Sequence, residues 1–288
     1  MTLATVRLGW RIQRSELFWT AVIAVVLTLG LGLIGLALQS LFASHQPCDA
    51  DFNGSGCGGL SALAIPWSQY GQFMLGLLWP FPVVVGSILG VAVTAGKLER
   101  RTAGMSWTLA RSRRRWLLVR LLPSALALFM ILGIVAIGAE WLTRSRLVTD
   151  QPGFIDYQLR SALFPLRGLL AFVTGAAVGA IIGRTLPALL IAIVFGTATS
   201  VSLLNFMDIL HTQAATFVPI AAMERYRYDY PLLAASGATI DGPGGGGNMV
   251  VPVAEFGYWI TVEALVLGVV IIGVGLLASV LVNHRSPS

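Results

Sequence analysis

Residues 17–42, LFWTAVIAVVLTLGLGLIGLALQSLF, form an uncharged apolar run that decides the fold class. A helix needs about 20 mostly apolar residues to cross the hydrocarbon core of a bilayer, and this run is longer than that. Five further runs of similar character follow at about residues 73–95, 116–142, 162–183, 186–210 and 258–282. The sequence therefore predicts an all-α integral membrane protein with six transmembrane helices.

The composition supports the same class. Hydrophobic residues make up 56% of the chain and charged residues only 11%, whereas a soluble domain carries about 25% charged residues. Six spans and their connections occupy most of the 288 residues. We therefore expect residues 1–288 to form a single transmembrane domain.

Basic residues are concentrated in the segments that would lie on one side of the membrane. With the N-terminus inside, the inner segments hold 13 of the 19 Lys and Arg residues and only two acids, Glu16 and Glu99. Lys and Arg favour cytoplasmic loops, so both termini are expected to be cytoplasmic. The excess of Arg over Lys is typical of a GC-rich genome and favours a bacterial plasma membrane. An Arg-rich loop can also bind nucleic acid, but its place between two spans argues against that partner.

Two segments have the pattern of anchors at the inner membrane surface. Arg7, Arg11 and Arg14 fall on one helical face and Trp10 lies on another, which predicts an amphipathic interfacial helix in contact with lipid. A disordered basic leader is the alternative. A second anchor is predicted where span three begins, at Arg113, Arg114, Arg115 and Trp116.

Small residues recur at every fourth position of span four, at Ala171, Gly175, Gly179 and Gly183. Such a stripe lets another helix approach closely, so we expect it to pack against a helix of this chain or of a second copy. Pro80 and Pro82 each remove a backbone hydrogen bond, and they should bend or break the outer half of span two.

Four ionisable residues lie near the outer ends of the spans: Glu140, Arg167, Asp208 and Glu263. Charge within a membrane is a functional-site hypothesis by default. A structural or gating ion pair at the outer side, solvated helix ends and a proton relay are the alternatives.

The two cysteines, Cys48 and Cys57, both lie in the first outer loop. A disulfide between them is one interpretation and free thiols are the other. Their spacing suits no metal site without further ligands.

The last outer loop, from about His211 to Gly257, is long enough to form an exit lid or a passive spacer. Its first part is expected to form short helices, and Gly242–Gly247 a flexible turn.

The second inner loop, AGKLERRTAGMSWTLARSRRRWLLVRLL at residues 95–122, carries the signal for a partner. Met105, Trp107 and Leu109 form an apolar patch between charged segments, which is typical of a helix that docks into a groove of another protein. A membrane-surface loop whose Trp dips into lipid is the alternative.

Within this loop, Leu98–Thr102, Ser106–Thr108 and Ser112–Leu117 resemble the inner loop of ABC-2-type exporter permeases. The six-span layout, the N-terminal helix and the long last outer loop resemble that family too, although Arg101 stands where the family usually has Gly. The resemblance implies two separate ATPase subunits and a second permease copy. It places the contact with the ATPase at Glu99, Thr102, Met105, Trp107, Leu109 and Arg111.

The chain itself contains no phosphate-binding loop, because the nearest match at Gly90 to Lys97 has the wrong spacing and lacks the Ser or Thr. ATP and Mg²⁺ would therefore be bound by the partner subunit, and this chain is not expected to be an enzyme. A secondary carrier, and an immunity or signalling protein of ABC-2 type that moves no substrate, are the alternative functions.

Overall fold

The computed structural model describes residues 3–44, 69–71, 73–99, 113–146, 159, 161–214, 216–219, 240–242, 245–250 and 256–284. Within these ranges, six segments are long and apolar enough to cross a membrane, at residues 17–40, 69–96, 121–143, 163–182, 185–207 and 257–280. The predicted six-span helical architecture is confirmed.

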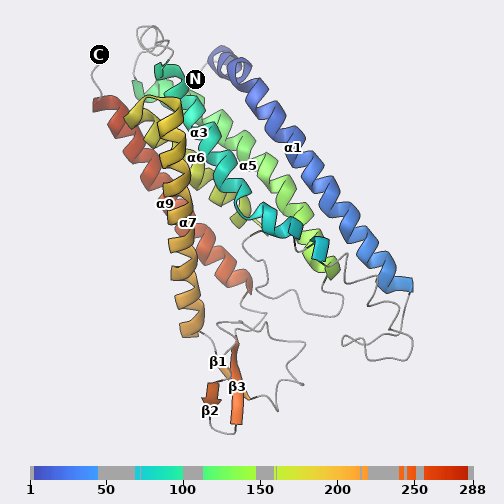
Figure 1. Ribbon diagram of the computed structural model, residues 1–288. Helices are drawn as coiled ribbons and strands as arrows, with labels where there is room; N and C mark the ends of the chain where they lie inside the picture. The colour runs from blue at the N-terminus through green and yellow to red at the C-terminus, as the bar shows by residue number, and fades with distance from the viewer. Residues whose placement is uncertain are drawn as a thin grey trace.

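The helices run alternately in opposite directions along one bundle (Figure 1). In chain order they are α1 (Leu3–Ser44), α3 (Phe81–Glu99), α5 (Arg113–Arg146), α6 (Leu163–Ile182), α7 (Thr185–Ala214) and α9 (Phe256–His284). The two ends of the chain lie at the same end of this bundle, and a small β-sheet lies at the opposite end.

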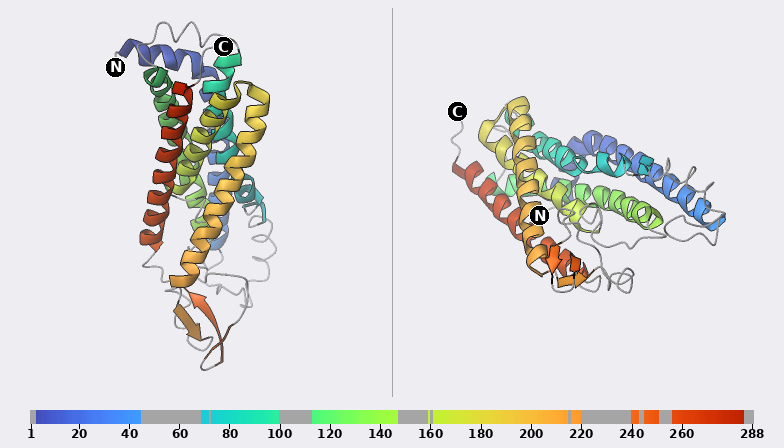
Figure 2. Two further views of the ribbon diagram at one scale, coloured as in Figure 1. Left: turned by 90° about the vertical axis from the view of Figure 1, so that its left-hand side faces the viewer. Right: turned by 60° about the horizontal axis from the view of Figure 1, so that its bottom comes forward.

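The predicted N-terminal helix is the first part of α1. Helical structure begins at Leu3 and continues into span one, which starts at Leu17. The first turns of α1 run across the end of the bundle rather than along it (Figure 2), which is the orientation expected of an interfacial segment.

Span two is interrupted by its prolines, as predicted. Residues 73–78 are helical, Trp79 and Pro80 form a turn, and α3 begins at Phe81. The Val84 N–H donates to the Pro80 carbonyl at 3.0 Å. Pro82 is tolerated in the first turn of α3, because an N–H at that position has no partner within the helix.

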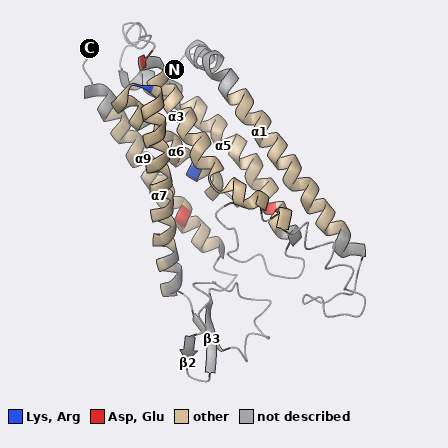
Figure 3. Cartoon of the chain, viewed as in Figure 1, with Lys and Arg blue, Asp and Glu red and all other residues tan. Residues whose placement is uncertain are grey.

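Helix α6 is the centre of the bundle. It packs against α3, α5, α7 and α9, whereas α1 packs mainly against α5. Within the spanning windows, 61% of α6 is buried but only 11% of α9. The charged residues are few along the spanning helices (Figure 3), as their apolar composition requires.

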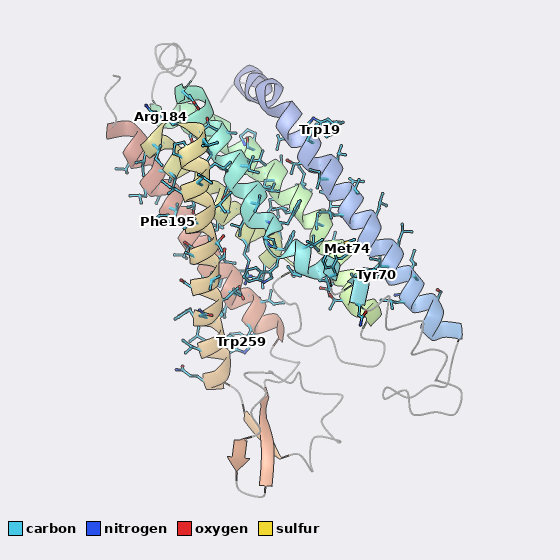
Figure 4. All side chains as sticks on the ribbon, viewed as in Figure 1. Trp19, Tyr70, Met74, Arg184, Phe195 and Trp259 are labelled. Atoms are coloured by element: carbon cyan, nitrogen blue, oxygen red, sulfur yellow. The ribbon has the colours of Figure 1, made fainter. Side chains whose placement is uncertain are left out.

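The outside of the bundle is apolar. Trp19 on α1, Phe195 on α7 and Val269 on α9 are all exposed, and Trp19 and Phe195 project from the ribbon in Figure 4. Several hydroxyl groups are satisfied by their own helix, as when the Thr28 hydroxyl donates to the Ala24 carbonyl at 2.8 Å. This surface suits contact with lipid chains, which offer no hydrogen bonds.

The last outer loop contains strands where short helices were predicted. Helix α7 continues to Ala214, and a three-stranded antiparallel sheet follows in the order β1 (Thr216–Pro219), β3 (Gly245–Val250), β2 (Ile240–Gly242). The prediction of a flexible turn over Gly242–Gly247 is wrong for Gly245–Gly247. These glycines pair in β3, where Gly247 stands opposite both Pro219 and Ile240.

Candidate functional site

The stripe of small residues on α6 forms the contact with α3. A Cβ added at Gly175 would meet the Ser87 carbonyl oxygen at 2.8 Å, and one at Gly179 would meet the backbone nitrogen of Ala95 at 3.2 Å. Ala171 is buried at the same interface. The stripe therefore faces a helix of the same chain, at a separation that leaves no room for larger side chains.

Helix α3 contributes glycines of its own to this contact. A Cβ at Gly86 would meet the Ala171 Cβ at 3.0 Å, and one at Gly90 would meet the Ala176 nitrogen at 2.9 Å. Both backbones are thus brought together by missing side chains. We refer to Gly86, Gly90, Ala171, Gly175 and Gly179 as the α3–α6 seam.

Gly183, the fourth member of the predicted stripe, terminates α6. Its φ of 71° lies in the left-handed region, and its N–H donates to the Gly179 carbonyl at 2.9 Å. Residues other than glycine rarely adopt this conformation at a helix end. The turn it makes brings Arg184 and Thr185 to the start of α7.

Two of the four outer ionisable residues form a buried ion pair. Nη2 of Arg167 on α6 lies 2.7 Å from Oε1 of Glu263 on α9, and the two side chains are 7% and 1% exposed. Leu163, Leu170 and Leu267 form the apolar core on this side of the bundle. Such a pair is costly to bury, and removing one partner commonly costs about 3–5 kcal/mol because a charge is left uncompensated.

The second carboxylate oxygen of Glu263, Oε2, is buried without a hydrogen-bond partner among the described residues. Glu140 is half-buried on α5, and the side chain of Asp208 lies outside the described part of the structure. The structure thus joins Arg167 to Glu263. The role of these four residues as an outer gate stays a prediction.

Glu99 makes a contact within the chain that the sequence does not predict. Its Oε2 accepts hydrogen bonds from the Thr185 N–H, at 2.9 Å, and from the Thr185 hydroxyl. Glu99 is the last residue of α3 and Thr185 the first of α7. The carboxylate therefore caps the N-terminus of α7, where backbone N–H groups lack partners and negative charge is favourable.

Several predicted site residues lie outside the described residues. They are Cys48 and Cys57 of the first outer loop, and Thr102, Met105, Trp107, Leu109 and Arg111 of the inner loop. The backbone of the two anchor segments is helical, but the described side chains do not include Arg7, Trp10, Arg11, Arg14, Arg113, Arg114, Arg115 and Trp116. Their roles stay predictions.

The fold and these contacts can be set against known proteins. A family model described as "ABC-2 membrane transporter related" matches residues 20–207. The chain belongs to this family. The match extends from span one through span five and includes the inner loop, so the resemblance predicted from the loop residues is confirmed. Comparisons with curated proteins and with solved structures found no match.

Membership of the family identifies this chain as a membrane component of an ABC-2 type transporter system. Components of this kind are permeases and are generally not enzymes themselves. The family also implies ATPase partners within such a system.

Proposed function

We propose that the protein is the transmembrane permease subunit of an ATP-driven exporter, in which two permeases form the substrate pathway and separate ATPase subunits bind ATP and Mg²⁺. The observation that supports this most is the family match over residues 20–207, which coincides with five of the six spans and contains the inner loop. The six-helix bundle with both termini at one end is compatible with that role.

The orientation follows from charge. The end of the bundle that carries the two chain termini (Figure 1) also carries Arg184 (Figure 4). In the sequence, the Arg-rich inner loop lies between the end of α3 and the start of α5. The positive-inside rule assigns this end to the cytoplasm. The sheet and the Arg167–Glu263 pair then lie toward the outer side of a plasma membrane.

The contact with the ATPase is proposed for the inner loop after Glu99. Met105, Trp107 and Leu109 supply an apolar patch that a groove can bury, while Thr102 and Arg111 flank it. A buried apolar anchor surrounded by polar groups is typical of a binding hot spot. Trp107 is therefore the residue on which the test is built.

The experiment co-expresses the permease with a candidate ABC ATPase from the same genome and measures co-purification and nucleotide-dependent transport in vesicles. Trp107→Asp places a charge at the docking surface, where desolvation of an unpaired charge is unfavourable. This variant should lose the ATPase, whereas Trp107→Phe keeps an aromatic anchor and should retain it.

The alternatives predict different outcomes. Transport that needs no ATPase and collapses with an ionophore would identify a secondary carrier and refute the proposal. A complex of two permeases and the ATPase that forms but transports no substrate would indicate a signalling or immunity protein. ATPase bound equally by the parent and by Trp107→Asp would move the contact away from this loop.

A further inference from the structure

The contact between Glu99 and Thr185 links two parts of the chain that are separated by 86 residues. Glu99 ends α3 and lies in the first part of the inner loop of residues 95–122. Thr185 begins α7, directly after the turn that ends α6. One carboxylate oxygen therefore joins the base of the inner loop to the α6–α7 turn.

The start of α7 depends on an acceptor from elsewhere. The first N–H groups of a helix have no partner within it, and the first carbonyl of this turn, that of Arg184, accepts from the Ala188 N–H at 3.3 Å. Pro187 has no N–H at all. Thr185 is the position where Glu99 supplies an acceptor, both for the backbone N–H and for the hydroxyl.

The contact joins α3 to α7, and these two helices pack together with α6. The α3–α6 seam leaves no free space between the two backbones. Helix α7 packs on both, because a Cβ at Gly196 would meet Val83 Cγ1 of α3 at 3.2 Å and the Ala171 Cβ of α6 at 3.7 Å. The α1–α5 pair forms a separate contact, joined to this unit chiefly through α5 and α6.

We propose that Glu99 is a positioning residue of the transport cycle, and that its carboxylate makes the α6–α7 turn follow the cytoplasmic end of α3 when a partner moves the inner loop. This inference rests on the proposed function, and it assigns Glu99 an action within the permease rather than a direct contact with the ATPase. The unit that responds to the ATPase is then α3, α6 and α7 together.

The test removes the bond from the side of Thr185, which carries no expected contact with the ATPase. Thr185→Pro deletes both donors, and Pro is well tolerated at the first position of a helix. Thr185→Ser retains both donors and is the matched control. Thr185→Val deletes the hydroxyl alone and serves where Thr185→Pro lowers the yield of folded protein.

Two quantities are measured: the substrate moved per ATP hydrolysed and the amount of co-purified ATPase. They are measured for the Thr185 variants, for Glu99→Ala and for the Glu99→Ala/Thr185→Pro double variant. We expect Glu99→Ala and Thr185→Pro each to lower the transport-to-hydrolysis ratio by about fivefold, the effect of losing one helix cap. ATPase binding should stay at the parent level, the double variant should equal the single ones, and Thr185→Ser should match the parent.

Loss of ATPase binding in Glu99→Ala together with parent-like coupling in Thr185→Pro would overturn the proposal, because Glu99 would then act on the partner directly.

Hydrogen exchange in the peptide that contains Thr185 provides a readout independent of transport. It should become about fivefold faster in Glu99→Ala, and unchanged exchange would refute the cap. If the parent permease binds no ATPase, the proposed function fails and the coupling role fails with it, whereas faster exchange would still establish the bond.

Discussion

The buried pair of Arg167 and Glu263 offers the sharpest test of the packing. The two side chains lie 2.7 Å apart and are 7% and 1% exposed, so the two charges pair directly inside the bundle. Arg167→Met or Glu263→Leu leaves a buried charge without its partner, which costs about 3–5 kcal/mol. For a domain of this size that is a fall on the order of 10 °C in the midpoint of thermal unfolding.

The double variant Arg167→Met/Glu263→Leu separates the pair from its surroundings. Replacing both charges by apolar side chains of similar volume is often neutral or stabilising, and Leu163, Leu170 and Leu267 provide an apolar environment for them. We therefore expect the double variant to unfold within a few degrees of the parent, with a strongly non-additive double-mutant cycle. Arg184→Met, an exposed arginine at the other end of the bundle, is the control and should change the midpoint little.

The assay is thermal unfolding of purified protein in detergent at one fixed scan rate, combined with transport by the reconstituted permease. Additive effects of the two substitutions, or single variants as stable as the parent, would show that the pair is solvated and would refute the reasoning. A double variant that is stable but leaks or fails to transport would support an outer gate. One that is stable and transports normally would identify a structural link between α6 and α9.

Two further predictions concern the seam and the orientation. Gly179→Leu should lower the free energy of unfolding by about 1–3 kcal/mol through overpacking of the α3–α6 seam. The control is Gly273→Leu on α9, where an added Cβ meets nothing within 4 Å, and it should melt like the parent. Equal melting temperatures of the two variants would contradict the close packing of the seam. Reporter domains fused after Ser288 should be active only when the reporter functions in the cytoplasm, and activity of a reporter that requires the outside would reverse the orientation.

The spans were predictable from the sequence because they depend on local properties. Length and hydropathy determine which segments can cross a bilayer. A proline can interrupt a span, as at Pro80, although α5 continues through Pro123. The break at Trp79–Pro80 and the α6 boundaries at Leu163 and Ile182 agree closely with the predicted limits. The sheet after α7 was missed because β1 and β2 are only four and three residues long, and β3 begins with three glycines, so none of the strands has the alternating pattern by which strands are recognised.

Which helices pack together was not predictable in the same way. Both α6 and α9 contain several glycines, yet Gly175 and Gly179 of α6 face α3, while added Cβ atoms at Gly268, Gly273 and Gly275 of α9 meet nothing within 4 Å. A stripe of small residues indicates that close approach is allowed and says nothing of the helix that uses it. Likewise, Arg167 and Glu263 were recognised as unusual charges, but their pairing depends on how α6 and α9 lie side by side.

Glu99 shows how a residue chosen for one reason can have a second contact that the sequence hides. The resemblance to ABC-2-type permeases places Glu99 at the contact with the ATPase, whereas the sequence assigns no role to Thr185. Yet the start of α7 has local signals, with Gly183 ending one helix, Pro187 in the first turn of the next and Thr185 between them. Helix starts of this kind favour a nearby carboxylate, and the alternating topology places α3's last residue on the same side of the membrane as α7's first. An acidic residue at the cytoplasmic end of a span should therefore first be tested as a cap for a helix that starts on the same side of the membrane. Only then should the acidic residue be assigned to a contact with a partner protein. For Glu99 this comparison leads to Thr185, and substitution at Thr185 distinguishes the internal cap from the ATPase contact.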